Sequence, residues 1–432
     1  MLGTVRKCVV VAQTSLQEVR RNILRTATVV GSSQFTDTKY NGTKLSSTIN
    51  GSGRPVYQRK SYRPRSHARS LSTLSTPAVR LPFSGTASME EECQDFMSVF
   101  PDIVRDLTEI GREFDIPDVS QWFEKVLHYN VPGGKQTRGL TVVYAYRMLA
   151  AKEELTPENI RLAHIMGWCV ETLQGHLLVL DDIMDVSTRR RGQTCWYLYE
   201  NIGPAAVNDA MLLEQGLYQL LRRYFHDKPY YARVLELFHD ITLKTVMGIS
   251  LDLITMELGK KAAFEKFTMD RFNSIAKYKT SYYTFIFPIA LSMHMAGIMG
   301  EEIPRQAQNI LFEIGNFYQV QDDYMDCFGD PELSGKIGTD IEDGKCTWLV
   351  VLALQRASPE QKALLADCYG SKDPEKVAAV KELYRQLGFH STFATYEDET
   401  YNIIRTHIQQ LSCGLPPKLF LKFMGMLYKR ER

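Results

Sequence analysis

The chain has no apolar run long enough to cross a membrane: a spanning helix needs roughly 18 or more apolar residues, and no stretch approaches that length. Its eight cysteines are scattered, with no CxxC pair or histidine–cysteine cluster. The usual spacings of zinc sites and disulfide frameworks are therefore missing. Strand-like alternation of apolar and polar residues is also scarce. We expect a soluble protein of a reducing compartment without a transmembrane segment.

Acidic residues are nearly missing from residues 1–89, which hold 14 Lys and Arg against only Glu18 and Asp37. The remaining chain holds 37 basic and 48 acidic residues, a net charge of −11. A leader rich in Arg, Ser and Thr is typical of a mitochondrial transit peptide, and a disordered basic tail is the alternative. We expect a leader over 1–88 and one folded domain over 89–432; a start at Met89 would give a cytoplasmic form.

From about residue 93 onward, apolar residues recur at three- and four-residue spacings, which is typical of amphipathic helices. Proline and glycine near residues 132–134, 203–204 and 329–331 predict breaks between them. The pattern predicts an all-α bundle, in which facing helices can build a site around a central cavity. The expected helices span residues 159–186, 205–225, 231–257, 270–298, 304–327 and 345–356.

Two acidic motifs of the form DDxxD are present, DDIMD at residues 181–185 and DDYMD at residues 322–326. The first and last aspartates of each motif share one helix face. A single copy is more often a solvated face or a helix cap, but each copy here follows an apolar run. Buried like charges need a cation, and Mg²⁺ is usually held by a few carboxylates together with substrate phosphates. The metal candidates are Asp181, Asp182, Asp185, Asp322, Asp323 and Asp326.

Basic residues accompany both motifs. Arg189–Arg191 follows the first motif, Lys336 and Lys345 follow the second, and Lys135 and Arg138 lie upstream. A solvated turn is the alternative explanation for the arginine run. Cations beside carboxylates indicate a ligand with several phosphate oxygens, which Arg and Lys bind while a metal bridges the ligand to the aspartates.

The run 181–192, the run QDDYMDCFGDP at 321–331 and the run GKIGTD at 335–340 together resemble the farnesyl diphosphate synthase family, over roughly residues 95–432. The resemblance implies an all-α isoprenoid-synthase-type bundle around a central active-site cavity. It also implies a homodimer that uses three Mg²⁺ ions and binds isopentenyl and allylic diphosphates, without a nucleic-acid partner.

The resemblance also implies roles for single residues. Asp181, Asp185 and Asp322 would hold Mg²⁺, with the other three aspartates supporting them through water or outer contacts. The isopentenyl diphosphate pocket would consist of Lys135, Arg138, Gln174 and Arg191. The allylic diphosphate would contact Arg190, Lys279, Lys336 and Lys345. Thr280 and Gln319 would face the carbocation, Arg430 would belong to a basic tail over the occupied site, and the catalytic set would be Lys279, Thr280, Gln319 and Arg190.

The sequence departs from the family at two places. His176 and Leu177 stand where animal members usually carry two aromatic residues that stop chain growth, and Val246 and Ile249 replace usually polar residues. These four positions are candidates for an altered chain-length pocket with relaxed length or homologue selectivity. A hydrogen-bonded core histidine is the alternative for His176.

We expect condensation of isopentenyl diphosphate with dimethylallyl or geranyl diphosphate to give farnesyl diphosphate. The alternatives are a family-derived terpene synthase, which ionises a prenyl diphosphate without condensation, and a non-catalytic partner subunit. A terpene synthase has no use for an isopentenyl diphosphate pocket, and Lys135, Arg138, Gln174 and Arg191 are all present. Condensation is therefore favoured.

Overall fold

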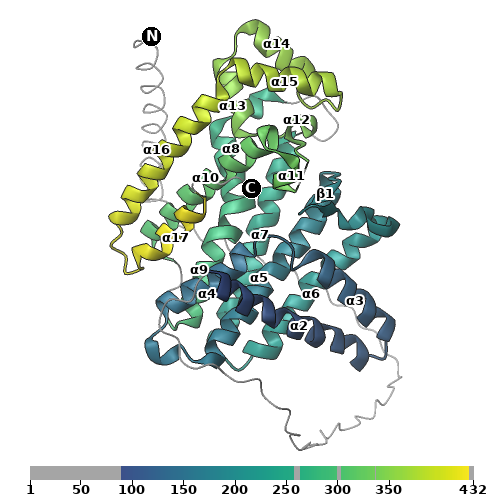
Figure 1. Cartoon of the computed structure of the whole chain (residues 1–432), viewed down its shortest axis with the longest axis vertical. Helices are drawn as coiled ribbons and strands as arrows, with labels where there is room; N and C mark the ends of the chain where they lie inside the picture. The colour runs from purple at the N-terminus through teal and green to yellow at the C-terminus, as the bar shows by residue number, and fades with distance from the viewer. Residues whose placement is uncertain (1–88, 257–262, 299–302, 336, 428–432) are drawn as a thin grey trace, which may run out of the picture. The chain divides into compact units, whose positions relative to one another are not determined.

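The computed structural model describes residues 89–256, 263–298, 303–335 and 337–427. The predicted leader 1–88, Lys336 and Arg430 lie outside these residues. Within them the regular secondary structure is helical apart from the two-residue strands β1 (Arg189–Arg190) and β2 (Gln193–Thr194), which pair antiparallel. The all-α prediction is confirmed (Figure 1). No helix in the described part is long and apolar enough to span a membrane.

The helices fall into two groups by length. The longer ones are α2 (Met89–Glu113), α3 (Pro117–Asn130), α4 (Thr137–Leu149), α5 (Pro157–Met184), α6 (Ala206–Phe225), α7 (Tyr231–Met256), α10 (Arg305–Phe328), α15 (Pro374–Gln386), α16 (Phe389–Gln409) and α17 (Pro417–Leu427). The shorter ones are α8 (Met269–Ile275), α9 (Phe287–Met295), α11 (Pro331–Ser334), α12 (Asp340–Asp343), α13 (Trp348–Arg356) and α14 (Pro359–Cys368).

The segment expected as one helix over 270–298 consists of three helical pieces. Between α8 and α9 lies a π-helix, η5 (Ala276–Ile286). It packs against α7 on one side and α10 on the other. Such π segments inside helices are frequent at functional sites because they rotate side chains out of the regular α-helical order.

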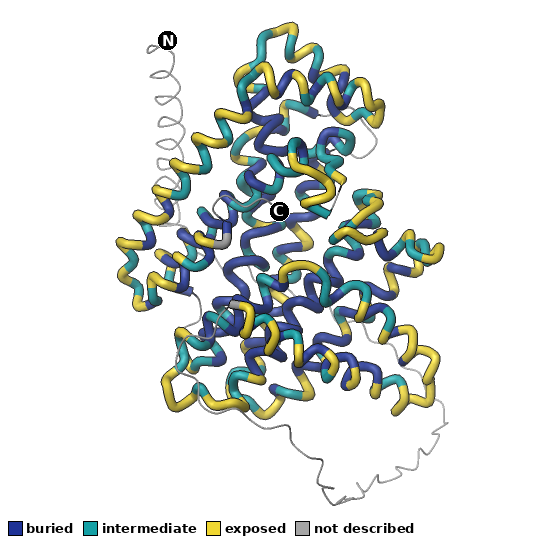
Figure 2. Tube along the Cα trace, in the orientation of Figure 1, coloured by how far each residue is buried: buried dark blue, intermediate teal, exposed yellow. Residues whose placement is uncertain are grey.

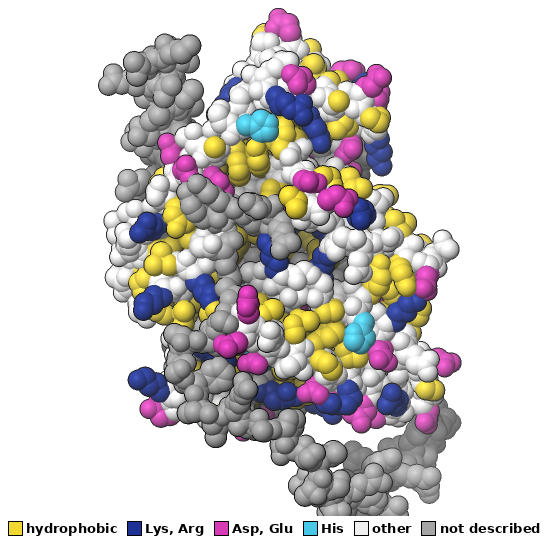
Figure 3. Space-filling model, in the orientation of Figure 1, with side chains coloured by type: hydrophobic (Ala, Val, Ile, Leu, Met, Phe, Trp, Pro, Cys, Tyr) yellow, Lys and Arg dark blue, Asp and Glu magenta, His cyan; other side chains and the backbone are white. Residues whose placement is uncertain are grey.

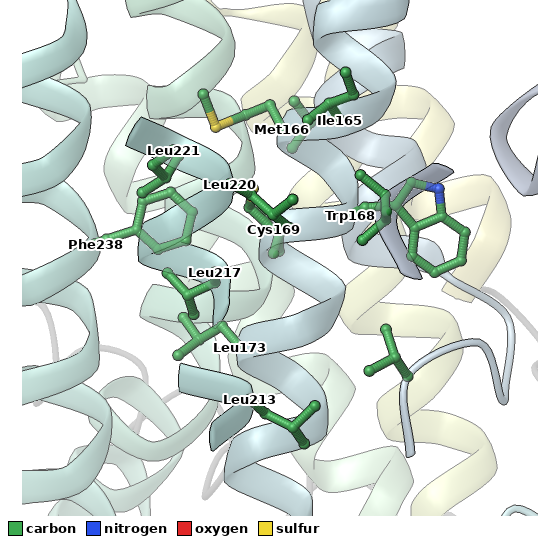
Figure 4. Packing of buried hydrophobic residues seen from close by; sticks show 14 of the residues in the cluster. Ile165, Met166, Trp168, Cys169, Leu173, Leu213, Leu217, Leu220, Leu221 and Phe238 are labelled. Carbon is green, nitrogen blue, oxygen red and sulfur yellow. The ribbon is translucent and has the colours of Figure 1, made fainter. Parts of the chain in front are cut away.

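Helix α5 is the most buried long helix of the bundle and carries the first acidic motif at its end. Thr156 caps its start by accepting a hydrogen bond from the Asn159 backbone, and Pro157 occupies the first turn, where proline fits well. Buried residues run almost continuously from Leu162 to Leu177, and Figure 2 shows burial concentrated along the inner helices. Helix α5 is held mainly by α4 and α6; Figure 4 shows its apolar contacts with α6.

Helix α5 ends in a Schellman motif directly after the first acidic motif. The Ser187 N–H donates to the Asp182 carbonyl at 2.9 Å and the Val186 N–H to the Ile183 carbonyl at 3.4 Å. Val186 has a φ of 52°, a left-handed conformation that usually requires glycine. The chain therefore turns sharply after α5, and the β1–β2 hairpin, which carries Arg189 to Arg191, lies close to the first acidic motif.

Candidate functional site

A cavity of about 300 Å³ lies between α5, α7, η5 and α10. Both acidic motifs open into it, as the sequence predicts for motifs on separate long helices. On the surface shown in Figure 3, acidic and basic side chains are interspersed, whereas inside the cavity they face one another. The predicted site residues that line it are Arg138, Gln174, Leu177, Asp181, Asp185, Arg190, Ile249, Lys279, Thr280, Gln319, Asp322, Asp323, Asp326 and Lys345.

The three aspartates of the first motif have different surroundings. Asp181 and Asp185 line the cavity, whereas Asp182 does not. Asp182 is 4% exposed, and its Oδ1 accepts hydrogen bonds from Nε and Nη2 of Arg190 at 2.8 and 2.6 Å. Burial raises the pKa of Asp182, and the charge of Arg190 opposes that shift. Asp182 thus positions Arg190. The sequence predicts that Asp182 supports a metal ion and does not predict this contact.

Two lysines compensate the other carboxylates of the first motif. Lys279 Nζ lies 2.8 Å from Asp252 and 3.5 Å from Asp181. Lys345 Nζ lies 2.7 Å from Asp185 and 3.5 Å from Asp340. Although burial acts to raise it, the pKa of Asp181 falls to about 2 because Lys279, Lys345 and Arg190 surround the carboxylate.

Sequence reasoning missed Asp252 and Asp340 as partners of these lysines. The available signal was Asp252 as the single charged residue in the last twelve residues of α7, 245–256, and the GKIGTD run for Asp340. Both lysines were expected to contact an allylic diphosphate. In the described structure they bind carboxylates, and the same ammonium groups face the cavity where such a ligand would enter.

A hydrogen-bonded chain leads from η5 to the second motif. Thr280 Oγ1 donates to Gln319 Oε1 at 2.7 Å, and Gln319 Nε2 donates to Asp323 at 2.9 Å. The Trp348 backbone N–H also donates to Asp323, at 2.8 Å. Burial, together with the charge of Asp340, raises the pKa of Asp323. Asp323 is therefore fixed by protein groups, while Asp322 and Asp326 are the more outward members of the motif.

Two glycines fix η5 between its neighbours. A Cβ added at Gly248 of α7 would lie 2.2 Å from the backbone nitrogen of Lys279, and one at Gly315 of α10 would lie 2.1 Å from Ser281 Oγ. Both helices therefore approach η5 more closely than any larger residue permits. These two close contacts fix the position of η5 and therefore the positions of Lys279 and Thr280 in the cavity wall.

A basic pocket adjoins the first motif. Arg138 donates to the hydroxyls of Tyr283 and Thr284, each at 2.8 Å, and its guanidinium lies 4.4 Å from the centre of the Tyr283 ring. Arg191 donates to the Asn130 carbonyl at 2.9 Å. Burial and the charges of Arg138 and Arg190 lower the pKa of Arg191, although Glu171 opposes this. Such crowding of cations favours the binding of an anion in this pocket.

Gln174 lies in the same region, with its Oε1 buried and without a hydrogen-bond partner among the described residues. A smaller hollow of about 30 Å³ shares Arg190 with the cavity and is also lined by Arg191 and Gly133. Lys135 is exposed on the turn before α4 and does not line either hollow. The structure therefore brings together three of the four residues expected to form this pocket.

Two of the expected chain-length residues lie elsewhere. Val246 is 43% exposed on the outer face of α7, because one residue turns a helix by about 100° and Thr245 and Ile249 already face the cavity. His176 is buried and donates from Nδ1 to the Ala210 carbonyl of α6 at 2.8 Å. Assigning Val246 and His176 to the cavity is therefore corrected, and His176 is the hydrogen-bonded core histidine of the alternative. Leu177 and Ile249 do line the cavity.

The chain is similar to known proteins over most of its length. A family model described as polyprenyl synthetase matches residues 120–387. A farnesyl pyrophosphate synthase of Nezara viridula is 52% identical over 359 residues, covering 83% of this chain and 87% of that protein. The farnesyl pyrophosphate synthase of Homo sapiens is 48% identical over 344 residues, covering 79% and 82%. A solved structure of T. brucei farnesyl diphosphate synthase complexed with risedronate has a TM-score of 0.75 at 33% identity, covering 79% of this chain and 100% of that chain.

Proposed function

The chain belongs to the polyprenyl synthetase family, and from that premise we propose that it condenses isopentenyl diphosphate with dimethylallyl and geranyl diphosphate to give farnesyl diphosphate. One observation carries the proposal: both acidic motifs and the basic residues Arg138, Arg190 and Lys279 line one cavity. The basic pocket supplies a second diphosphate site, which condensation needs and a terpene synthase does not. The named relatives are farnesyl diphosphate synthases, which also favours condensation over the two alternatives.

We propose Mg²⁺ as the metal, and the donor set fits it. Asp181, Asp185, Asp322 and Asp326 offer hard carboxylate oxygens to one cavity. Within the described residues, no three His, Cys, Asp or Glu side chains gather closely enough to hold an ion alone. Ions there would complete their coordination with substrate phosphates, and we expect three of them. When bound, Mg²⁺ would act as a Lewis acid that stabilises negative charge on the leaving diphosphate.

The chain's own residues then divide the work. Arg138 and Arg191 bind and orient isopentenyl diphosphate, while Lys279 and Lys345 turn towards the allylic diphosphate. The Thr280 and Gln319 oxygens face the allylic carbon as it becomes cationic, where preorganised dipoles stabilise developing charge. We assign no side chain as the base, since the departing diphosphate can take the proton. Water must be kept out of the cavity during the reaction, because it would quench the cation.

We propose that chain length is decided at Leu177 and Ile249. Leu177 lies one turn before Asp181 on α5, and Ile249 lines the same cavity from α7. Leucine in place of a bulky aromatic side chain leaves space below the first motif, so homologous allylic substrates with an extra carbon should be accepted. Farnesyl diphosphate remains the expected main product.

We also propose a homodimer. Helix α7 carries exposed apolar side chains at Leu243, Val246, Met247 and Ile254, and neighbouring α6 adds Met211. Unpaired apolar stripes of this kind mark association surfaces, and a second copy is the commonest partner. Light scattering of the wild type and of Met247→Arg tests this. A dimer that the substitution dissociates supports the proposal, and a monomeric wild type contradicts it.

For localisation we propose mitochondrial import directed by residues 1–88, supported by their basic, acid-poor composition. A second form starting at Met89 would remain in the cytoplasm. Imaging the full chain and a form that starts at Met89, each fused to a fluorescent protein, tests the address. Diffuse signal from both contradicts import.

The test of the activity uses the purified chain with labelled isopentenyl diphosphate, dimethylallyl diphosphate and Mg²⁺. Label should appear in a fifteen-carbon product after dephosphorylation. Consumption of the allylic diphosphate without incorporation of label would instead indicate a terpene synthase. Inactivity alone but activity after mixing with a homologue would indicate a partner subunit.

A further inference from the structure

Helix α5 carries a buried carboxylate that lines neither hollow. Glu171 is 2% exposed, and its Oε1 accepts a hydrogen bond from the Gly139 N–H at 2.7 Å. A buried carboxylate costs several kcal/mol unless it is paired or hydrogen-bonded. Its location therefore calls for a role, and neither the acidic motifs nor the ion pairs of the cavity supply one.

The partner of Glu171 lies in the first turn of α4, which begins unusually. Gln136 stands at the N-cap with φ 45° and ψ 33°, and its side chain makes no capping hydrogen bond. The first N–H groups of a helix lack partners inside the helix. Glu171 supplies from α5 the acceptor that an N-cap side chain normally provides. The turn that carries Arg138 is thereby fixed to the neighbouring helix.

Two facing glycines bring Glu171 within reach of α4. A Cβ at Gly139 would lie 2.9 Å from Glu171 Cγ and 2.9 Å from the Gly167 carbonyl oxygen, and one at Gly167 would lie 2.7 Å from the Gly139 carbonyl oxygen. The backbones of α4 and α5 therefore touch at this crossing. Glu171 follows Gly167 by one turn on the same face of α5, which places its carboxylate under the start of α4.

Glu171 is also coupled electrostatically to the basic pocket. Burial raises its pKa, while the Gly139 N–H and the charges of Arg138 and Arg191 oppose that shift. The pKa of Arg138 is raised even though burial acts to lower it, and Glu171 contributes to the rise along with Tyr283 and Tyr318. Among the described residues, Arg138 hydrogen-bonds only to hydroxyls. Glu171 therefore places a carboxylate near both guanidinium groups without lining either hollow.

We propose that Glu171 is a positioning residue for isopentenyl diphosphate: its hydrogen bond to Gly139 locks the first turn of α4 against α5 and holds Arg138 at the cavity wall. Because Glu171 lines neither hollow, it acts through Arg138 and does not touch the substrate. This role rests on the proposed function, since it assigns Arg138 to the isopentenyl diphosphate pocket.

Steady-state kinetics of the full chain test the role. Glu171→Ala should raise KM for isopentenyl diphosphate at least about tenfold, as expected for loss of a buried charge-assisted hydrogen bond. KM for geranyl diphosphate and kcat should change less than threefold. Glu171→Gln keeps an acceptor oxygen of the same shape and should return KM to within threefold of wild type. Gly139→Ala, whose methyl group meets Glu171 Cγ, should raise the same KM.

Leu173→Ala is the matched control, because Leu173 is buried on the same helix and lies beside Leu213 and Leu217 of α6 (Figure 4). It should lower Tm without changing KM for isopentenyl diphosphate. The role is contradicted if Glu171→Ala lowers Tm alone, or raises KM for both substrates equally.

Calorimetric titration with isopentenyl diphosphate separates this role from the proposed function. A wild type that binds isopentenyl diphosphate without condensing it contradicts the proposed function, yet a tenfold weaker Kd in Glu171→Ala would still support the positioning role. Equal Kd values in the two chains contradict the role whatever the activity.

Discussion

The Lys345 ammonium lies 2.7 Å from the Asp185 carboxylate and so joins the last aspartate of the first motif to a lysine 160 positions further along the chain. Lys279 does the same for Asp181, at 3.5 Å. Both carboxylates are thus compensated by the protein itself. A metal cation should therefore bind these carboxylates weakly until an anionic ligand binds the two lysines in their place.

Ion binding should therefore depend on a diphosphate. Mg²⁺ alone should raise Tm by less than about 1 °C, whereas Mg²⁺ with methylenediphosphonate should raise it by about 3 °C or more through binding to the folded state. Differential scanning fluorimetry measures both, and EDTA should reverse the shift and abolish activity. A large shift with Mg²⁺ alone would show a metal site complete without substrate.

Neighbouring aspartates of the first motif should respond differently to the same substitution. Asp182→Asn breaks a buried pair with Arg190 and should cost about 2 kcal/mol or more of unfolding free energy. Asp185→Asn leaves Lys345 beside Asp340, so stability should change by less than about 1 kcal/mol, while kcat falls about a hundredfold or more. Urea unfolding and kinetics give the two values. Equal effects of both substitutions on stability would refute the division of roles.

Arg191 is held in a strained turn that would suit another residue better. With φ values of 54° and 78°, Arg191 and Gly192 form the tight turn between β1 and β2, where asparagine is preferred at the first position. Arg191→Asn should keep or slightly raise Tm but increase KM for isopentenyl diphosphate about tenfold or more. Arg223→Gln, on the surface, should leave KM unchanged. A fall in Tm with unchanged KM would make Arg191 a structural residue only.

A substitution at Val186 should raise the free energy of unfolding. Its left-handed conformation is costly for a β-branched residue, so Val186→Gly should stabilise the fold by about 1 kcal/mol. Ser187→Gly is the control, since Ser187 lacks a positive φ and glycine there should only destabilise. Chemical denaturation measures both. Loss of stability in Val186→Gly would mean that its exposed side chain contributes more than the backbone strain costs.

The helices and the meeting of the two acidic motifs could be predicted because both depend on local pattern: apolar periodicity, and aspartates one turn apart after an apolar run. The different surroundings of Asp182 and Asp185 could not, because they depend on where the hairpin returns Arg190. The π-helix was missed because its longer period cannot be distinguished from an α-helix over eleven residues.

The direction in which single side chains point was the second property that the sequence did not predict. Val246 and Ile249 are three residues apart, yet one faces outward and the other lines the cavity. A sequence that departs from its relatives at both positions does not say which of them faces the substrate. Glu171 was overlooked for a related reason: its partner is a backbone N–H of another helix, which no side-chain motif reveals.

A single-turnover experiment tests the central claim, that one cavity ionises an allylic diphosphate and condenses it with isopentenyl diphosphate. Purified chain in excess, loaded with geranyl diphosphate and Mg²⁺, is mixed rapidly with labelled isopentenyl diphosphate and quenched over time. We predict farnesyl diphosphate carrying one labelled unit per molecule, formed at the rate at which geranyl diphosphate disappears. Disappearance of geranyl diphosphate into unlabelled alcohols or cyclic products would contradict the account.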